Sequence, residues 1–509
     1  MSRPGMVYLV GGGPGDPGLI TLRGVQCLSR ADVVLYDALI HRDLLAHCKP
    51  NAQLEFVGKR AGNAPARQQA INEKLIAAAR DGLCVVRLKG GDPYLFGRGS
   101  EEAEVLAAAG IAFEVVPGVP SPLAATAYAG ISLSHRDKAS SIAYLTATES
   151  PDKQTSSHDF SKLATATQTL VIFMGVRKLA ELTAQLIAHG RSPDCPAAVI
   201  SKASLPEQQT IVGTVADIAQ KAQHAGVSMP ALTVIGEVVA LRQQLRWYDN
   251  KPLFGKRVLV TRAQEQAGDF IAALREAGAA AIEQPTIFIE PPTDMAPLQK
   301  AVEEVGEYDW VLFTSVNGVR RFMAELSSQH GDVRRFGAAR VGAIGPSTRD
   351  CLATYGIAAD AMPDTYRGEA LAEAVLANHD NHMHGLSVLL PRAEVARDAL
   401  PDMLRQAGAR VDVVSAYRSL PLAEDQAAQL RKALASGDVD IATFTSTSTV
   451  TNTVNALGSD AAALLSKVVV ASIGPITTES AQKLGIRVDV TAKDYTIAGL
   501  ICALEDHFQ

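Results

Sequence analysis

A long internal repeat in the second half of the chain constrains the fold more than any other feature of the sequence. The block VLVTRA at residues 258–263 recurs as VLLPRA at residues 388–393, which lies 130 residues later. Four further pairs recur at offsets of 129 to 131 residues, namely AGA at 277 and 407, FTS at 313 and 444, IGP at 344 and 473, and Tyr366 and Tyr495. This period is too long for a solenoid, so it predicts two similar α/β lobes, one from each copy, with a ligand cleft between them.

Short apolar runs alternate with helix-like segments along the whole chain. The runs rich in β-branched residues fit buried strands and lie at residues 7–10, 33–36, 84–88, 169–174, 257–260 and 310–313. Segments of helical composition lie between them, as at residues 100–109 and 266–277. This alternation predicts an α/β fold with largely parallel sheets. An aperiodic stretch near residues 241–255 predicts a linker between two units of similar size.

Composition excludes several classes of function. The chain of 509 residues is too long for one hydrophobic core, and its net charge of -6 provides no global positive field for nucleic acid. Its six cysteines are scattered without metal-like spacing, which is typical of a reducing compartment. The first apolar run is too short for a signal peptide, and no stretch approaches the length of a membrane span. We therefore expect a cytoplasmic protein without a metal site that binds neither nucleic acid nor a membrane.

The glycine-rich opening of the chain fits two interpretations. Residues 13–18 read GPGDPG, which satisfies G-x-G-x-x-G after an apolar run, and Asp37 ends the next run. This spacing favours a nicotinamide-dependent oxidoreductase. However, Pro14 and Pro17 each remove a backbone N–H donor from the turn, so the loop suits a ligand without a pyrophosphate.

A series of glycine-rich and charged motifs runs through the first half of the chain. They are GPGDP at residues 13–17, YDAL at 36–39, VGKRAG at 57–62, RLKGGDPYLFGRG at 87–99, VPGV at 116–119, LSHR at 133–136, PAL at 230–232 and GEVV at 236–239. In this order they resemble the uroporphyrinogen-III methyltransferase branch of the tetrapyrrole methylase family, over nearly all of residues 6–245. The resemblance implies a two-lobed methylase fold, S-adenosyl-L-methionine as cofactor, and a homodimer formed through this half.

The same resemblance implies roles for individual residues. Asp37 is the implied base for the proton displaced from the macrocycle, with Lys59 as a proton donor. The implied cofactor-binding residues are Pro14, Gly90, Gly91, Asp92, Leu95, Pro120, Ser121, Met174 and Ala203. Glycines permit close backbone approach to a sulfonium methyl donor, and we expect Asp92 to accept hydrogen bonds from the cofactor's hydroxyls or ammonium group.

A basic rim suits a substrate that is rich in carboxylates. The basic residues that flank the motifs are Arg60, Arg87, Lys89, Arg98 and Arg136. Of these, Arg60, Arg98 and Arg136 are predicted substrate contacts.

Four positions depart from the family's usual pattern. Pro120-Ser121 stands where a threonine is common, Ala64 where histidine is common, Ala147-Thr148 where Gly-His is common, and residues 201–203 (SKA) replace Glu-Asn-Gly or Glu-Asn-Ala. These departures bear on cofactor affinity and rate more than on the class of reaction.

The second half of the chain offers few catalytic side chains. Residues 253–509 contain no G-x-S-x-G motif, no metal cluster and no Ser/His/Asp constellation. The polar residues that recur in the repeat follow apolar runs, which places them at the carboxyl ends of strands, where neutral donors can meet carboxylates. These residues are Thr314, Ser315, Thr445, Ser446, Thr477, Tyr366 and Tyr495.

Four motifs of this half carry a second resemblance. They are GKRVLVTR at residues 255–262, FTSVNG at 313–318, IGP at 473–475 and YTIAGL at 495–500. They are similar to motifs of uroporphyrinogen-III synthase, a two-lobed fold that closes hydroxymethylbilane with inversion of the last pyrrole. The resemblance implies that Tyr417 assists departure of the hydroxyl group and that Thr314, Ser315, Thr445, Ser446 and Thr477 contact the substrate.

Together these features predict a bifunctional enzyme of tetrapyrrole synthesis. We expect a methyltransferase at residues 1–245, a linker at 246–254 and a synthase at 255–509. The synthase would make uroporphyrinogen III, and the methyltransferase would methylate it at C2 and C7 to precorrin-2. Three alternatives stay open at this point: a non-catalytic tetrapyrrole-binding module in the second half, a nicotinamide-dependent oxidoreductase in the first, and a methylase that acts on another corrinoid precursor.

Overall fold

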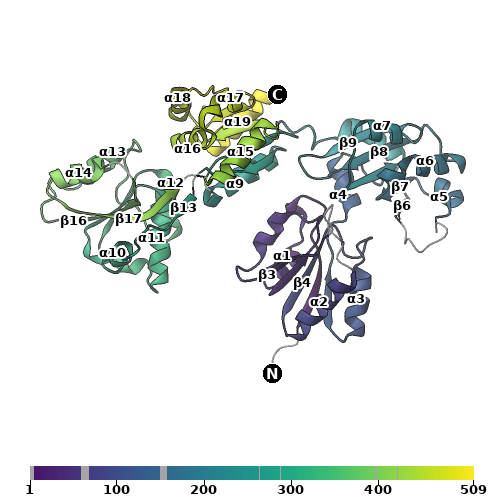
Figure 1. The fold of residues 1–509 in the computed structure, drawn as a ribbon, viewed down its shortest axis with the longest axis horizontal. Coiled ribbons are helices and arrows are strands. Elements are labelled where there is room, and N and C mark those ends of the chain that lie inside the picture. Colours follow the sequence, from purple (N-terminus) through teal and green to yellow (C-terminus); the bar gives the residue numbers. More distant parts are fainter. Residues whose placement is uncertain are drawn as a thin grey trace. The chain divides into compact units, whose positions relative to one another are not determined.

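The computed structural model describes residues 5–58, 68–148, 158–262, 264–286, 288–395, 398–420 and 422–509. These residues form two compact units (Figure 1), the first made mainly of residues up to Arg257 and the second mainly of residues 258–504. Each unit contains two five-stranded sheets within these described ranges. Helices separate most of the strands along the chain, which confirms the predicted α/β fold.

The first sheet of the first unit is parallel throughout. Its strands are ordered β3-β2-β4-β1-β5. Apolar residues that alternate along these strands face two different helix layers, so that Val85 packs towards α2 and α3 while Val86 packs towards α1. The elements are β1 (Met6–Gly11), α1 (Leu22–Leu28), β2 (Val33–Tyr36), β3 (Gln53–Phe56), α2 (Gln68–Arg80), β4 (Cys84–Lys89), α3 (Gly99–Ala108) and β5 (Ala112–Val116).

This strand order does not fit a dinucleotide-binding fold. In that fold the first strand lies between the second and fourth strands, whereas here β4 lies between β2 and β1. The loop after β1 then enters η1 (Pro17–Leu19), a single 3-10 turn capped by Asp16, rather than the start of an α-helix. The structure therefore argues against the nicotinamide interpretation of the opening motif.

The second sheet of the first unit is mixed, with strands ordered β6-β7-β10-β8-β9. The β6–β7 pair is parallel and the other three pairs are antiparallel, so the prediction of largely parallel sheets is wrong here. The strands β7, β8 and β10 are covered by core residues on both faces, and such continuous apolar runs look alike in either direction. The elements are α4 (Ser121–Tyr128), β6 (Ile142–Thr146), α5 (Phe160–Ala166), β7 (Thr169–Phe173), α6 (Leu179–Ala188), β8 (Pro196–Ser201), β9 (Gln209–Thr214), α7 (Ile218–His224), β10 (Ala231–Ile235) and α8 (Arg242–Leu245).

The aperiodic segment after α8 packs against the first unit. Trp247 donates a hydrogen bond from Nε1 to the carbonyl oxygen of Ala127 at 2.9 Å, and the Tyr248 ring lies 4.8 Å from the Tyr128 ring, centroid to centroid. Tyr248 is 5% exposed and Leu253 is fully buried. Aromatic packing thus anchors this segment to the unit that precedes it.

The second unit also contains two five-stranded sheets. One has the order β12-β11-β18-β19-β20 and the other the order β13-β17-β16-β14-β15. The strands are β11 (Arg257–Val260), β12 (Ala280–Glu283), β13 (Phe288–Glu290), β14 (Trp310–Phe313), β15 (Arg340–Ala343), β16 (Ser387–Ala393), β17 (Arg410–Leu420), β18 (Ile441–Phe444), β19 (Val469–Ser472) and β20 (Val490–Thr491). The helices are α9 (Gln264–Glu276), α10 (Ala296–Glu303), α11 (Val316–Ser328), α12 (Pro346–Thr354), α13 (Gly368–Ala377), α14 (Ala399–Gln406), α15 (Glu424–Ala435), α16 (Thr447–Leu457), α17 (Ala461–Leu465), α18 (Pro475–Lys483) and α19 (Ile497–Phe508).

The two copies of the repeat exchange halves between these sheets. In the repeat β11 corresponds to β16, and β14 corresponds to β18. In the structure β11 pairs with β18, Val258 facing Ile441, whereas β14 pairs with β16, Trp310 facing Val388. Figure 1 accordingly shows α9 of the first copy among the yellow-green helices α15, α16 and α19 of the second. Two similar lobes are present as predicted, but the assignment of one copy to one lobe is wrong, because a repeat reveals equivalent segments and not their partners.

Candidate functional site

The loops after three parallel strands of the first unit meet at one edge of the sheet. Gly91, after β4, donates its N–H to the carbonyl oxygen of Gly13, after β1, at 2.7 Å, and Gly13 donates back at 3.2 Å. A Cβ atom on Gly118, after β5, would lie 2.3 Å from the Gly91 oxygen. Backbone therefore packs directly on backbone here, which requires glycine.

The loop after β1 also touches the second sheet of this unit. Gly15 has a φ of +135°, and a Cβ atom there would lie 2.7 Å from the carbonyl oxygen of Ala203. The Asp16 N–H donates to Ser204 Oγ at 3.0 Å, and Ser204 Oγ donates to the carbonyl oxygen of Pro14 at 3.3 Å. Two of the predicted cofactor residues, Pro14 and Ala203, are thereby brought together from distant parts of the sequence.

Further predicted cofactor residues surround the glycine contact. A Cβ atom on Gly91 would lie 3.8 Å from the backbone nitrogen of Ser121, the first residue of α4 after the N-cap Pro120. A Cβ atom on Gly90 would lie 2.9 Å from Cβ of Leu39. The start of α4 and the loop after β2 thus border the same region.

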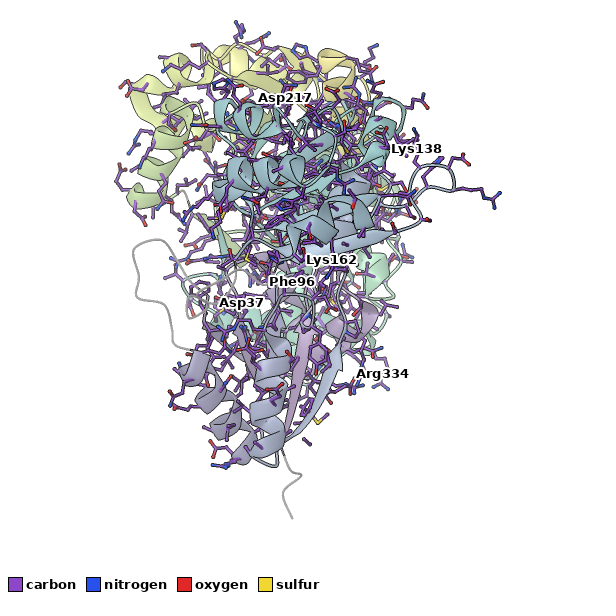
Figure 2. All side chains as sticks on the ribbon, turned by 90° about the vertical axis from the view of Figure 1, so that its right-hand side faces the viewer. Asp37, Phe96, Lys138, Lys162, Asp217 and Arg334 are labelled. Atoms are coloured by element: carbon purple, nitrogen blue, oxygen red, sulfur yellow. The ribbon has the colours of Figure 1, made fainter. Side chains whose placement is uncertain are left out.

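The segment after Gly91 reaches the second sheet as well. Leu95 and Ala203 both pack against the core cluster of that sheet. The Phe96 ring (Figure 2) lies 4.7 Å from the Phe173 ring at the end of β7. Met174 follows directly, with a φ of +54° and 44% of its surface exposed. The structure therefore gathers the predicted cofactor residues at adjoining loops of the two sheets.

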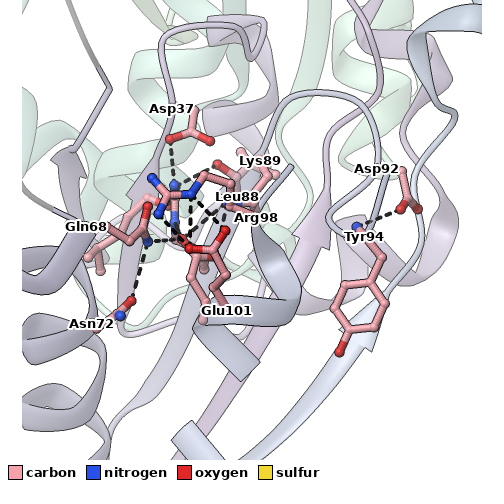
Figure 3. A network of polar contacts seen from close by, with 12 residues as sticks. Asp37, Gln68, Asn72, Leu88, Lys89, Asp92, Tyr94, Arg98 and Glu101 are labelled. Atoms are coloured by element: carbon pink, nitrogen blue, oxygen red, sulfur yellow. Dashed lines mark hydrogen bonds and ion pairs between the residues drawn. The ribbon is translucent and has the colours of Figure 1, made fainter. Parts of the chain in front are cut away.

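Asp92 uses its carboxylate to shape its own loop. Oδ1 accepts the N–H groups of Tyr94 at 2.8 Å (Figure 3) and Leu95 at 3.2 Å, and Oδ2 accepts the N–H of Gly118 at 3.0 Å. These three bonds fix the loop after β4 against the loop after β5. Fixing the loop is the role that the structure shows, and contact with a cofactor stays a prediction.

Asp37, the predicted base, lies at the same edge of the parallel sheet, directly after β2. Its Oδ1 lies 2.6 Å from Nη2 of Arg87, which in turn donates from Nε to Oε1 of Glu102 at 3.1 Å (Figure 3). The Asp37 side chain is 28% exposed, whereas Arg87 and Glu102 are buried. The carboxylate is thus accessible from outside and held by a buried cation from behind.

Lys89 completes this buried charge cluster. Its Nζ lies 3.1 Å from Oε2 of Glu102, and burial together with the positive charge of Arg87 lowers the pKa of the Lys89 amine. The prediction that Arg87 and Lys89 belong to a basic rim is therefore wrong. They lie two residues apart on a strand, so both side chains point to the same face, where α3 supplies Glu102.

The other predicted basic residues fall into two groups. Arg98 is exposed and forms a fork with Glu101, with Nη2 to Oε2 at 2.5 Å and Nε to Oε1 at 3.0 Å. Arg136 is exposed in a turn. Lys59 and Arg60 lie outside the described residues, and their roles stay predictions.

In the second unit, Tyr417 and Ser315 come together at one sheet. The Tyr417 hydroxyl lies 3.1 Å from Ser315 Oγ, which also accepts the Gly318 N–H at 3.0 Å as the N-cap of α11. Thr314 precedes Ser315 and is half-buried. Tyr417 is 8% exposed, and burial raises the pKa of its phenol, against a smaller opposing effect of the Ser315 hydrogen bond. The phenol is therefore neutral at physiological pH.

The equivalent residues of the other sheet are arranged similarly. Ser446 is the N-cap of α16 and accepts the Thr449 N–H at 3.2 Å, and Thr445 before it is half-buried. Thr477 near the start of α18 is only 5% exposed, while its neighbour Ile476 is 77% exposed. Thr477 is therefore part of the packed interior of this lobe. Its burial does not support the predicted contact between its hydroxyl group and the substrate.

The repeated tyrosines have matching environments. A Cβ atom on Gly345 would lie 3.1 Å from the Tyr366 ring, and one on Gly474 would lie 2.9 Å from the Tyr495 ring. Tyr366 is 61% exposed and Tyr495 is 66% exposed. Each lobe therefore presents an exposed ring packed on the glycine that precedes a helix.

Sequence reasoning missed Glu102 and Ser204. The signal for Glu102 was present, because two cations on one face of a buried strand require a buried anion. Ser204 carried no such signal, since its partners Asp16 and Pro14 lie almost 190 residues away.

The described residues contain neither a metal-binding cluster nor a helix suited to span a membrane. No group of three or more histidine, cysteine, aspartate or glutamate residues there is arranged to hold a metal ion. Among the helices in the described part of the chain, none combines the length and apolar character needed to cross a membrane.

Comparisons with known proteins match both halves of the chain. The family described as tetrapyrrole (corrin/porphyrin) methylases matches residues 6–219, and the family described as uroporphyrinogen-III synthase HemD matches residues 268–502. These two matches agree with the resemblances that the motifs carry.

Similar proteins are known from several bacteria. The porphyrin biosynthesis protein HemD of Ruminiclostridium josui is 36% identical over 98% of this chain and 97% of its own length. The uroporphyrinogen-III C-methyltransferase of Bacillus subtilis is 41% identical over 66% of this chain and 69% of its own. The structure of uroporphyrin-III C-methyl transferase from Thermus thermophilus complexed with S-adenyl homocysteine is 38% identical, covers 46% of this chain and 99% of that one, and has a TM-score of 0.41. The chain therefore belongs to the family of porphyrin biosynthesis proteins that join a tetrapyrrole methylase to a uroporphyrinogen-III synthase.

Proposed function

We propose that the two halves catalyse consecutive reactions of tetrapyrrole biosynthesis. The C-terminal half cyclises hydroxymethylbilane to uroporphyrinogen III, and the N-terminal half methylates that product at C2 and C7 to give precorrin-2. The observation that carries the proposal is the similarity to a porphyrin biosynthesis protein along 98% of the chain. The early substrate is favoured over a later corrinoid precursor because the product of one half is then the substrate of the other.

The cofactor of the N-terminal half is S-adenosyl-L-methionine, which supplies an electrophilic sulfonium methyl group when bound. The residues present fit such a group, because a Cβ atom on Gly91 would meet only the backbone nitrogen of Ser121, at 3.8 Å, so this glycine presents bare backbone to open space beside the start of α4. The residues that would hold the cofactor are Pro14, Gly90, Gly91, Asp92, Leu95, Pro120, Ser121, Met174 and Ala203. Holding donor and acceptor in register supplies much of the catalysis in a displacement of this kind.

Asp37 is the proposed proton acceptor for methylation. The macrocycle carbon that gains a methyl group carries no hydrogen, so each methylation is balanced by loss of a proton from another position of the macrocycle, and Asp37 accepts that proton on its partly exposed carboxylate. Lys59 is the proposed proton donor. Arg60, Arg98 and Arg136 would pair with substrate carboxylates, for which the exposure of Arg98 and Arg136 is the support.

Tyr417 is the proposed acid for ring closure. It donates its proton to the departing hydroxyl group, which leaves as water, and the bond that closes the ring then forms with loss of one proton from the substrate. The raised pKa of Tyr417 keeps the phenol protonated, and Ser315 orients it. Thr314, Ser315, Thr445, Ser446 and Thr477 are the proposed substrate contacts, with Thr477 the least supported because its side chain is buried.

The proposal also covers the organisation of the protein. The methyltransferase would extend over residues 1–245, the linker over 246–254 and the synthase over 255–509. A homodimer through the methyltransferase half rests on family resemblance, and a cytoplasmic location rests on the scattered single cysteines.

The decisive test is a mass and absorbance assay with hydroxymethylbilane, with and without S-adenosyl-L-methionine. We expect uroporphyrinogen III without the cofactor and a doubly methylated product with it. Formation of the uninverted isomer alone would show that the second half does not catalyse closure and would favour a tetrapyrrole-binding module. Uroporphyrinogen III that stays unmethylated with the cofactor present would refute the assignment of the first half.

A further inference from the structure

Four charged side chains of the first unit form a chain of contacts that ends at Asp37. Glu102 is fully buried on α3, and Arg87 and Lys89 on β4 are 2% and 3% exposed. Asp37 lies at the accessible end of the chain (Figure 3), with 28% of its side chain exposed. Two carboxylates thus face two cations, which balances the charges of the set.

Glu102 is the centre of this cluster. Its Oε1 accepts hydrogen bonds from Arg87 Nε at 3.1 Å, Lys89 Nζ at 3.2 Å and Gln68 Nε2 at 2.9 Å. Its Oε2 lies 3.1 Å from Lys89 Nζ. The carboxylate of Glu102 therefore holds donors from both β4 and α2.

The guanidinium of Arg87 is held on each of its three nitrogens. Nε binds Glu102, and Nη1 donates to the carbonyl oxygens of Leu35 and Leu88, each at 3.4 Å. Only Nη2 is directed to Asp37, at 2.6 Å. Because a guanidinium is planar, fixing Nε and Nη1 also fixes the direction of Nη2.

We infer that Glu102 is a positioning residue for methyl transfer, which orients Asp37 through Arg87. This inference rests on the proposed function of the first half. Glu102 itself does not touch the reacting groups; it sets the plane of Arg87, and Arg87 sets the position of the accepting carboxylate oxygen. Lys89 adds a second cationic partner to the same carboxylate, with Nζ 3.2 Å from Oε1 and 3.1 Å from Oε2 of Glu102.

The test compares variants of the full-length chain in methylation of uroporphyrinogen III. Glu102→Gln keeps the shape of the side chain and removes its charge, and Arg87→Lys keeps the charge and loses the planar fork. Since a displacement of about 1 Å in a reacting group costs about 100-fold in rate, we expect kcat to fall roughly 10- to 100-fold in each variant. The KM for S-adenosyl-L-methionine stays within about 2-fold, because the glycine loops are unchanged.

The double variant separates positioning from general damage. If Glu102 acts through Arg87, the variant with both substitutions is no slower than Arg87→Lys alone. Glu104→Gln, an exposed change on the same helix, is the matched control and keeps wild-type kcat. Ring closure by the second half reports whether each chain is folded elsewhere, and the melting temperature reports on the first unit.

Several outcomes overturn the inference. Wild-type kcat in Glu102→Gln would do so, as would multiplying losses in the double variant. If Glu102→Gln does not fold, Gln68→Met is the substitute, because it removes one half-buried hydrogen-bond donor to Glu102. We expect its kcat to fall by about 2- to 5-fold, which is the equivalent of one hydrogen bond. An unchanged kcat in this variant overturns the inference. A wild-type chain that does not methylate would instead refute the proposed function itself.

Discussion

The contact between Gly118 and Gly91 makes a sharp prediction about cofactor binding. In Gly118→Ala the new Cβ atom would lie 2.3 Å from the Gly91 carbonyl oxygen and 2.8 Å from Cα and the carbonyl carbon of Gly11. These neighbours are backbone atoms, so relief requires a loop to move until the contact widens from 2.3 Å to at least 3.0 Å. The loop that carries Gly91 and Asp92 is coupled to this movement, because Asp92 Oδ2 accepts the Gly118 N–H. We therefore expect the proposed cofactor surface to be displaced by a sizeable fraction of an ångström.

The expected effect is a loss of both affinity and rate. A displacement of this size is predicted to weaken binding of S-adenosylhomocysteine by about 10-fold or more and to lower the methylation kcat by up to about 100-fold. Calorimetric titration measures the first quantity and a methylation assay the second. Ring closure stays within about 2-fold, and Gly268→Ala, where a Cβ atom meets nothing within 4 Å, is the control for the chemical change itself. Wild-type affinity in a folded Gly118→Ala protein would refute the placement of the cofactor at this contact.

Three further predictions test other parts of the structure. Asp37→Asn and Lys59→Ala lower methylation by about 100-fold or more and leave ring closure intact, as measured by product masses; a joint loss of both activities in a folded variant would contradict the division of roles. Tyr417→Phe slows ring closure by about 10- to 100-fold. Because burial raises the pKa of Tyr417 above 10.0, loss of its proton does not limit the wild-type rate of ring closure below pH 10, and a pH–rate profile checks this. Burial, and then the hydrogen bond to Asp412, raise the pKa of Tyr308 to about 12, so the folded form binds this proton more tightly than the unfolded form. We therefore expect the second unit to lose stability as pH rises from 10 to 12. In melting measured across this pH range, Tyr308→Phe loses less stability than the wild type.

The strands of the central sheets could be predicted from the sequence because burial alone determines them. The runs at residues 33–36, 257–260 and 310–313 match β2, β11 and β14 residue for residue. Strand direction in the sheet formed by β6 to β10 could not be predicted in the same way. An apolar run that is buried on both faces has the same composition whether its neighbour is parallel or antiparallel.

The candidate methylation site could be predicted in outline for a similar reason. Glycines mark places where backbone approaches backbone, and the contact of Gly91 with Gly13 is of this kind. The roles of Arg87 and Lys89 were not predicted correctly, since a charged residue beside a motif is more commonly found at the surface. Only the structure shows that Glu102 lies opposite both of them.

The exchange of repeat halves has a consequence for how the second unit folds. Because β11 needs β18 and β14 needs β16, neither sheet can form from one copy of the repeat alone. The chain crosses from one sheet to the other between β12 and β13 and crosses back between β17 and β18. Each sheet therefore closes over a long segment of sequence, and such closure carries an entropic cost that local contacts do not offset.

The two lobes are in return joined by two chain segments and not by one. One lobe carries the Ser315–Tyr417 pair, and the other carries the equivalent Ser446. Two chain crossings thus connect the lobes whose helix-capping serines, Ser315 and Ser446, are the proposed substrate contacts.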